Sequence, residues 1–166
     1  SNSLQLKYKN IELLPLMNEI YEATLLRMPS DVHLELNSDD NMVFYTDQDR
    51  LTQIITNLLN NAIKHTVKGF IRFGYHTKAH ETHFFVTDSG EGIPEDKFND
   101  IFTRFVQLKE TNKGVGLGLA ICKGLVTQMG GRIHVESKEN KGSTFTVILP
   151  NAGITKTNES KEIKGI

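Results

Sequence analysis

The sequence predicts one domain that is built from both helices and strands. Three apolar stretches have helical spacing, and six shorter apolar runs are bounded by turn-forming residues, as strands are. A length of 166 residues and a hydrophobic content of 38% are enough for one ordinary core. The net charge of -1 argues against broad nucleic-acid binding, which shows as a strong basic excess.

The ends of the chain differ in composition from its middle. We expect residues 1–10 to be an expression remnant or linker, residues 11–150 to form the domain, and residues 151–166 to form a polar tail. No apolar run approaches the roughly 20 residues that span a bilayer, and no secretory signal opens the chain, so we expect a soluble segment without membrane contact. The one cysteine, Cys122, argues against an intramolecular disulfide and a cysteine-built metal site, and its apolar helical pattern predicts a buried structural thiol.

The first half of the chain begins with a helix and two strands. Apolar residues at mainly helical spacing predict a helix from Ile11 to about Arg27, which Pro29 ends. Residues 32–36 alternate in polarity and residues 43–45 form a short apolar run, so we expect a pair of strands joined across the turn residues between them. A small edge sheet should therefore precede the second helix.

The second helix runs from about Asp47 to Thr66. It is entered through Thr46, with Asp49 three residues later, an arrangement similar to a capping box. A polar stripe flanks its apolar face at positions i, i+4 and i+7, formed by Asn57, Asn61 and Lys64. Three polar groups in register on one helix indicate a site.

The second half of the chain combines strands with a long irregular segment. Residues 70–75 and 82–87 are predicted to pair as strands, before an irregular segment from Asp88 to Val115. Within that segment residues 95–105 can form a short helix, and the polar stretch 106–113 is typical of a mobile lid. The remaining predicted elements are a helix over residues 119–129 that ends at Gly130-Gly131, and alternating strands over residues 132–136 and 143–149.

Two glycine-bearing segments about twenty residues apart predict a purine-nucleotide site. The first, residues 88–94, begins with Asp88 at the end of a strand, where a fixed carboxylate can accept a hydrogen bond from an exocyclic amine such as that of adenine. Gly90 and Gly92 let the backbone pass close by. The second, residues 114–119, precedes a helix, so its free amides can cradle phosphate oxygens. Adenine at one end and phosphates at the other fit a nucleoside triphosphate.

These motifs follow one another in a fixed order. The order is Asn57-x3-Asn61-Ala-x-Lys64, Asp88-x-Gly90-x-Gly92, Phe102-x2-Phe105 and Gly114-x-Gly116-x-Gly118-Leu119, closed by Gly142-Ser143-Thr144-Phe145. It resembles the ATP-binding catalytic domain of two-component sensor histidine kinases, where the first four are the N box, first glycine box, F box and second glycine box. The resemblance covers about residues 11–150. It implies an α+β fold, a two-layer sandwich in which three helices cover one face of a mixed, largely antiparallel sheet.

The resemblance also implies roles for single residues. Asn61 would ligate Mg²⁺ through its amide oxygen, Asn57 would bind phosphate or water, and Lys64 would neutralise phosphate charge. His65, where relatives often have Tyr or Phe, would lie flat against adenine. The other residues implied in nucleotide binding are Asp88, Gly90, Gly92, Ile93 and Thr144 around the base, and Gly114, Val115, Gly116, Leu117, Gly118 and Leu119 around the phosphates. Arg104 would contact the γ-phosphate or a partner domain, and Lys109 and Lys113 rank below it.

The identity of residue 57 separates a kinase from a hydrolase. Hydrolytic relatives of this fold have a water-activating glutamate four residues before the magnesium asparagine, whereas Asn57 cannot act as a general base. We therefore expect a Mg-ATP-dependent kinase that phosphorylates a histidine on a separate dimerisation and phosphoacceptor domain, and through it a response regulator receiver domain. None of the six histidines has the family's acceptor motif. The resemblance implies a cytoplasmic, monomeric domain of a membrane-bound sensor, and the alternatives are a non-catalytic ATP-binding or docking module and an ATP hydrolase.

Overall fold

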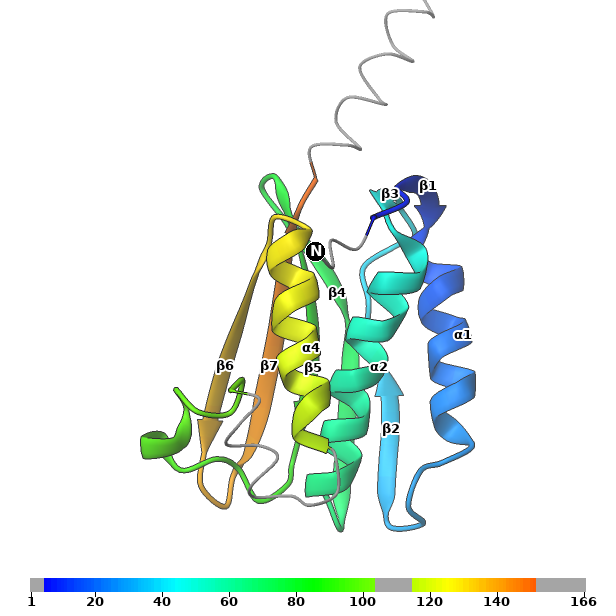
Figure 1. The fold of residues 1–166 in the computed structure, drawn as a ribbon. Coiled ribbons are helices and arrows are strands. Elements are labelled where there is room, and N and C mark those ends of the chain that lie inside the picture. Colours follow the sequence, from blue (N-terminus) through cyan, green and yellow to red (C-terminus); the bar gives the residue numbers. More distant parts are fainter. Residues whose placement is uncertain (1–4, 104–114, 152–166) are drawn as a thin grey trace, which may run out of the picture.

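The structure is a computed structural model that describes residues 5–103 and 115–151. It has two layers, in which three helices cover one face of a five-stranded sheet (Figure 1). The helices are α1 (Leu13–Leu25), α2 (Gln48–His65) and α4 (Val115–Gln128), and a 3₁₀ turn, η1, covers Glu95–Lys97. The strands are β1 (Lys9–Glu12), β2 (Val32–Leu36), β3 (Val43–Thr46), β4 (Gly69–Lys78), β5 (Glu81–Asp88), β6 (Arg132–Lys138) and β7 (Gly142–Pro150).

The large sheet has the strand order β2-β4-β5-β7-β6. Only the β2–β4 pairing is parallel, and the other three are antiparallel. Three helices on one face of this sheet confirm the fold expected from the sequence.

The predicted pairing of residues 32–36 with residues 43–45 is wrong. β2 pairs in parallel with β4, which lies beyond α2 in the chain, and β3 pairs antiparallel with β1. β1 begins at Lys9, within the stretch expected to be linker, and its extended backbone delays the first helix from Ile11 to Leu13. A small separate sheet does precede α2, but one of its two strands is not the predicted one.

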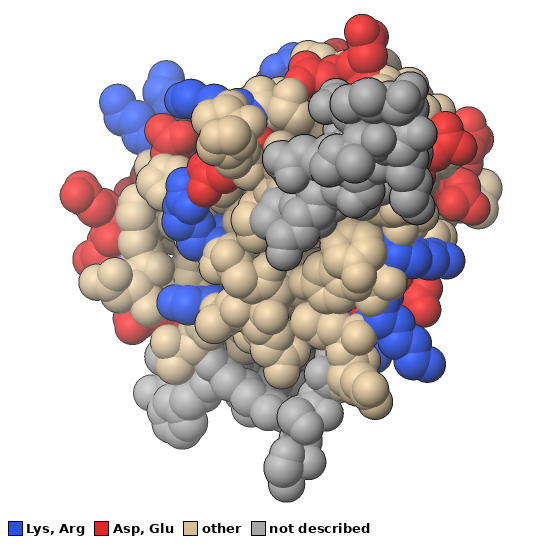
Figure 2. All heavy atoms as spheres, turned by 90° about the horizontal axis from the view of Figure 1, so that it is seen from above, with Lys and Arg blue, Asp and Glu red and all other residues tan. Residues whose placement is uncertain are grey.

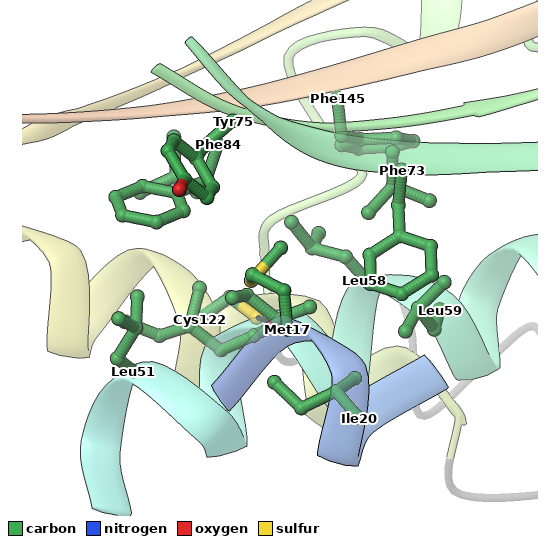
Figure 3. Close-up of a cluster of buried hydrophobic side chains, with 14 of the residues drawn as sticks. Met17, Ile20, Leu51, Leu58, Leu59, Phe73, Tyr75, Phe84, Cys122 and Phe145 are labelled. Atoms are coloured by element: carbon green, nitrogen blue, oxygen red, sulfur yellow. Dashed lines mark hydrogen bonds between the residues drawn. The ribbon is translucent and has the colours of Figure 1, made fainter. Parts of the chain in front are cut away.

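The core lies between the helices and the sheet (Figure 3). Met17 and Ile20 of α1 and Leu58 of α2 are buried against aromatic side chains of the sheet, among them Phe73 and Phe84. These aromatic residues point to the helix-covered face because side chains alternate along a strand. Cys122 of α4 joins this cluster, which confirms the predicted buried thiol. Burial raises the pKa of the Cys122 thiol to about 12.

The N-terminus of α2 differs from its prediction by one residue. Asp47, not Thr46, is the N-cap, and its carboxylate accepts hydrogen bonds from the backbone N–H groups of Arg50 (3.0 Å) and Lys7 (2.8 Å). Thr46 is the last residue of β3 and its buried hydroxyl has no hydrogen-bond partner in the part of the chain that the structure describes. Strand pairing with β1 therefore extends through the residue that the sequence pattern suggested as the cap.

The segment after β5 is less helical than predicted. Among the described residues 95–103, only η1 is helical; Ile101 and Phe102 lie in a turn, and Arg104 and Phe105 lie outside the described residues. The end of α4 at Gly130 agrees with the prediction, and this glycine has a φ of 77°.

The end of the molecule that carries β1 and β3 is seen in Figure 2. Acidic and basic side chains are interspersed around its rim. No helix among the described residues is long and apolar enough to cross a membrane.

Candidate functional site

Three predicted motifs meet at one end of the sheet. The C-terminus of α2, the end of β5 and the N-terminus of α4 all lie at the lower end of the molecule in Figure 1. The two helices are joined there by Asn57, whose Nδ2 donates to the carbonyl oxygen of Gly118 over 3.3 Å. The N box and the second glycine box are therefore in direct contact.

Asp88 is a buried hydrogen-bond acceptor at this end of the sheet. The residue is 4% exposed, and its Oδ1 accepts the N–H of Gly90 over 2.8 Å. Burial raises the pKa of the Asp88 carboxyl, although the hydrogen bond from Gly90 and the charge of His65 oppose this shift. A carboxylate can accept more hydrogen bonds than the backbone supplies here, so Asp88 can receive a donor from a ligand.

The two glycines after Asp88 stand where the backbone passes close to other segments. A Cβ on Gly90 would collide with the carbonyl oxygen of His65, and a Cβ on Gly92 would collide with that of Lys138. Gly92 also has a φ of 72°, a conformation that other residues rarely adopt. The prediction that these glycines permit close backbone approach is confirmed.

Asn61 has the properties of a cation ligand. The residue is 8% exposed, and among the described residues its side-chain amide is not one of the buried polar groups that lack a partner, so the amide reaches solvent. The oxygen of a solvent-accessible amide suits a hard cation such as Mg²⁺. Lys64, one turn further along α2, is half-buried. No ligand is present, so the assignment of Asn61 to Mg²⁺ and of Lys64 to phosphate stays a prediction.

His65 at the end of α2 has a partner that the sequence did not reveal. Its Nδ1 lies 2.5 Å from Oε2 of Glu91, in the first glycine box. The backbones are joined as well, because the N–H of Glu91 donates to the carbonyl oxygen of His65 over 3.2 Å. The histidine predicted to stack on adenine is thus fixed to the loop that begins at Asp88.

Thr144 lies opposite Thr87 in the β5–β7 ladder, and not opposite Asp88. The hydroxyl of Thr144 pairs with that of Thr87 over 2.9 Å. Both side chains lie on the sheet face away from the helices, because their neighbours along β5 and β7 face the helices. Ser143 stands opposite Asp88 in the β5–β7 ladder and is 7% exposed, so the hydroxyl beside Asp88 belongs to Ser143. Ser143 was not among the predicted site residues, although alternation counted back from the apolar Phe145 places it on the inner face.

Ile93 is tied to the sheet near the same position. Its N–H donates to the hydroxyl of Ser137 over 2.7 Å, and its side chain is partly buried against the core. Ser137, on β6, also contacts the hydroxyl of Ser143 over 2.8 Å. The residue expected to line the base is therefore held in place by a serine that sequence analysis did not identify.

The predicted phosphate end is described only in part. Val115, Gly116, Leu117 and Gly118 form the first turn of α4, whose leading backbone N–H groups have no partner within the helix. The side chain of Leu119 is 6% exposed and belongs to the core. The predictions for Gly114, Arg104, Lys109 and Lys113 concern residues outside those that the structure describes.

Phe102 of the F box packs against the sheet and α4. Its ring meets that of Phe145 edge-on, with centroids 6.1 Å apart, and Nζ of Lys123 lies 5.5 Å from the centre of the Phe102 ring. This residue anchors the segment after β5 on the sheet and on α4.

Known proteins with similar sequences contain the same kind of ATP-binding domain that the motifs and their arrangement indicate. The family model described as histidine kinase-, DNA gyrase B-, and HSP90-like ATPase matches residues 46–153. Aerobic respiration control sensor protein ArcB of Escherichia coli is 42% identical over 111 residues, which are 63% of this chain and 14% of ArcB. Adaptive-response sensory kinase SasA of Synechococcus elongatus is 34% identical over 155 residues, which are 89% of this chain and 40% of SasA. The chain thus spans less than half the length of these relatives.

Solved structures give the same result. Full-length ShkA in complex with AMPPNP superposes with a TM-score of 0.82 at 26% identity, over 90% of this chain and 32% of ShkA. The nucleotide-free catalytic domain of histidine kinase ThkA superposes with a TM-score of 0.76 at 28% identity, over 88% of this chain and 97% of that domain. The chain belongs to the family of histidine kinase-, DNA gyrase B- and HSP90-like ATPases, as a catalytic domain of the histidine kinase kind.

Proposed function

We propose that this domain binds Mg-ATP and donates the γ-phosphoryl group to a histidine on a separate dimerisation and phosphoacceptor domain. The observation that carries the proposal is the meeting of a buried acceptor, Asp88, with the two asparagines of α2 and the N-terminus of α4. This arrangement would take a base at one end and phosphates at the other. The ShkA structure, which superposes on this chain, was solved with AMPPNP.

At the base end, Asp88 would accept the exocyclic amine of adenine. His65 would lie against the ring, while Gly90, Gly92 and Ile93 would form the wall beside it. The backbone contacts of Gly90 with His65 and of Ile93 with Ser137 keep this wall in a fixed position before ligand arrives. A site that is ordered in advance loses less entropy when it binds.

At the phosphate end, the first turn of α4 would direct backbone N–H groups at phosphate oxygens. The residues expected there are Gly114, Val115, Gly116, Leu117, Gly118 and Leu119, with Lys64 adding positive charge. Asn61 would hold Mg²⁺ together with the phosphates, and Arg104 would contact the γ-phosphate or the partner domain. When bound, Mg²⁺ neutralises charge on the phosphates and holds them in a defined geometry.

Asn57 decides between transfer to histidine and hydrolysis. An amide cannot remove a proton from water at neutral pH, and the side-chain NH₂ of Asn57 already donates to Gly118. A neutral imidazole needs no such base, because its ring nitrogen presents a lone pair for in-line attack. The domain would then only align the γ-phosphoryl group and compensate its charge.

The acceptor histidine would lie on another part of a longer protein. ArcB and SasA, by their names a sensor protein and a sensory kinase, both extend well beyond the matched region. We therefore assign the phosphoacceptor helices, and a response regulator that takes the phosphate from them, to chains or segments outside these 166 residues. The catalytic domain would act in the cytoplasm, where ATP is available, and would be monomeric by itself.

The test is transfer from γ-labelled ATP. The domain would be joined to the upstream helices of its own gene and compared with the isolated domain and with Asn61→Asp. The matched control is Asn60→Ala, because Asn60 is an exposed neighbour on α2 that bonds to Arg27 and not to the site. We expect acid-labile label on the joined protein, near-complete loss in Asn61→Asp and full labelling in Asn60→Ala.

Two other results would point to the alternatives. Label released only as inorganic phosphate would favour a hydrolase that uses an acid in place of Asn57. ATP binding without labelling or release would favour a non-catalytic module in which nucleotide changes the shape of the domain.

A further inference from the structure

Ser137 on β6 connects three groups at the base end of the site. Its hydroxyl lies 2.7 Å from the backbone nitrogen of Ile93, 3.0 Å from the carbonyl oxygen of Gly142 and 2.8 Å from the hydroxyl of Ser143. All three distances are within the range of good hydrogen bonds.

Counting protons fixes the direction of these hydrogen bonds. The backbone N–H of Ile93 can only donate and the carbonyl of Gly142 can only accept, while a serine hydroxyl has one proton and two lone pairs. If Ser137 donates its proton to Gly142, it has lone pairs left for Ile93 and for Ser143. All three contacts are satisfied only when the hydroxyl of Ser143 donates to Ser137.

The direction of the Ser143 hydrogen bond determines which groups Ser143 can bind beside Asp88. Ser143 and Asp88 are direct partners in the β5–β7 ladder and both face the buried side of the sheet. With its proton directed at Ser137, the Ser143 oxygen can only accept hydrogen bonds, as the Asp88 carboxylate does. Two neighbouring acceptors match the two hydrogens of an exocyclic amine, and they repel a carbonyl oxygen at the same position.

We propose that Ser137 is a positioning residue that makes this site selective for a 6-amino purine over a 6-oxo purine. It acts through Ser143, whose proton it holds away from the ligand, and through Ile93, whose backbone it fixes. The inference rests on the proposed function, because it assumes that the purine ring of a nucleotide lies against Asp88. Without Ser137, the Ser143 hydroxyl is free to rotate and to donate to a 6-oxo group.

The experiment compares the binding of ATP and ITP in the presence of Mg²⁺ by isothermal titration calorimetry. ITP replaces the 6-amino group by oxygen, carries a proton on N1 and lacks the 2-amino group of guanine, so the ratio of the two dissociation constants reports on the 6-position together with the adjoining N1. The variants are Ser137→Ala, Ser137→Thr, which restores the hydroxyl, and Thr146→Ala. Thr146 is a matched control because it is a half-buried hydroxyl residue of β7 on the sheet face away from the helices.

We expect the unmodified protein to prefer ATP, and Ser137→Ala to lower that preference by about tenfold, the effect of one well-placed hydrogen bond in a buried site. Ser137→Thr should recover most of the preference, and Thr146→Ala should keep all of it. A purely structural role for Ser137 would weaken both nucleotides equally. Melting temperatures measured beside the titrations show whether each variant is folded.

The failures of the two proposals differ. An unchanged ratio of the ATP and ITP dissociation constants in folded Ser137→Ala, including an equal loss of affinity for both nucleotides, would overturn the role of Ser137 and leave the proposed function standing. A folded, unmodified protein that binds neither nucleotide would overturn the proposed function, and the role of Ser137 with it.

Discussion

Asp88 combines a cost to folding with a role in binding. Its carboxyl is buried at the end of β5, and burial raises its pKa above the ordinary value of 3.8 despite the hydrogen bond from Gly90. A carboxyl with a raised pKa in the folded state destabilises the fold once it is ionised. The residue is therefore better explained by what it binds than by what it stabilises.

We predict that Asp88→Asn lowers affinity for ATP by about a hundredfold or more, because an amide can turn a donor toward the adenine amine. The same change should stabilise the ligand-free domain at pH 7, by about 2–4 °C in melting temperature for each kcal/mol of relieved desolvation. The stability cost of Asp88 is absent below pH 3.8, where the carboxyl is protonated in both states, and appears as pH rises through the raised pKa. Calorimetric melting at pH 3.5 and pH 7 should show the difference only at pH 7.

Unchanged ATP affinity in Asp88→Asn would refute the placement of the base. A melting-temperature difference that is equal at both pH values would show that the variant acts through packing and not through ionisation.

Single residues were predictable where their position was set by neighbours in the chain. Asp88, Gly90 and Gly92 follow a strand directly, and the structure places them at its end as expected. Ser143 was not predicted beside Asp88 because moving one residue along a strand reverses the face that a side chain occupies, and the resemblance pointed to Thr144. The contact of His65 with Glu91 joins residues that are 26 positions apart in the sequence. A local sequence pattern does not reveal contacts over such a separation.

Gly90 supports the junction between α2 and the loop after β5. We predict that Gly90→Ala destabilises the domain by about 2–4 kcal/mol, because its Cβ would meet the carbonyl of His65, a backbone atom that cannot move independently. Gly124→Ala is the matched control, since Gly124 lies in α4 and its Cβ would meet nothing within 4 Å. That variant should stabilise the domain by about 0.5–1 kcal/mol through helix propensity. Urea unfolding measures both, and equal effects would contradict the close approach.

The start of α2 depends on Asp47. Burial pushes the pKa of this carboxyl upward, but the hydrogen bonds from the backbone of Lys7 and Arg50 outweigh it and lower the pKa below its ordinary value of 3.8. A lowered pKa in the folded state means that ionised Asp47 stabilises the fold above pH 3.8, and that this stability is lost as pH falls through the lowered pKa.

We predict that Asp47→Ala lowers the free energy of unfolding at pH 7 by about 1–2 kcal/mol, as the loss of an N-cap does. Asp47→Asn keeps an acceptor and should lose less. Urea unfolding across pH 2–7 should show the gap between the unmodified protein and Asp47→Ala narrowing in acid. A gap that stays constant with pH would mean that the charge of Asp47 contributes nothing and that only its shape as a cap matters.

Elements were easier to predict than their pairing. The apolar periodicity of α2 and the alternation of β5 are local, and both elements formed where expected. β2 was joined to the wrong strand because its partner, β4, follows only after β3 and α2. Parallel pairing of this kind is decided by how the helix packs on the sheet, which is a property of the whole fold.

At the scale of the molecule, the site lies where the two layers meet. Asp88 and Ser143 come from the sheet, while Asn57, Asn61 and Gly118 come from the helices. A nucleotide bound between them would add contacts between layers that are otherwise held together by the core. Binding should therefore be coupled to the stability of the whole domain and not only to the order of a loop.

We predict that Mg-ATP raises the melting temperature of the domain, because a ligand that binds only the folded state stabilises it by RT ln(1 + [L]/Kd). At a ligand concentration of a hundred times Kd this is about 2.7 kcal/mol, or roughly 5–10 °C for a domain of this size. ATP with EDTA should give a much smaller shift, since phosphate charge is then left without the cation that Asn61 is proposed to hold. Asn61→Asp should reduce the Mg-ATP shift, whereas Asp88→Asn should remove the shift with and without Mg²⁺. Differential scanning fluorimetry of the unmodified protein and both variants, each with Mg-ATP and with ATP in EDTA, measures these shifts. Equal shifts of the unmodified protein under the two conditions would contradict the magnesium role of Asn61.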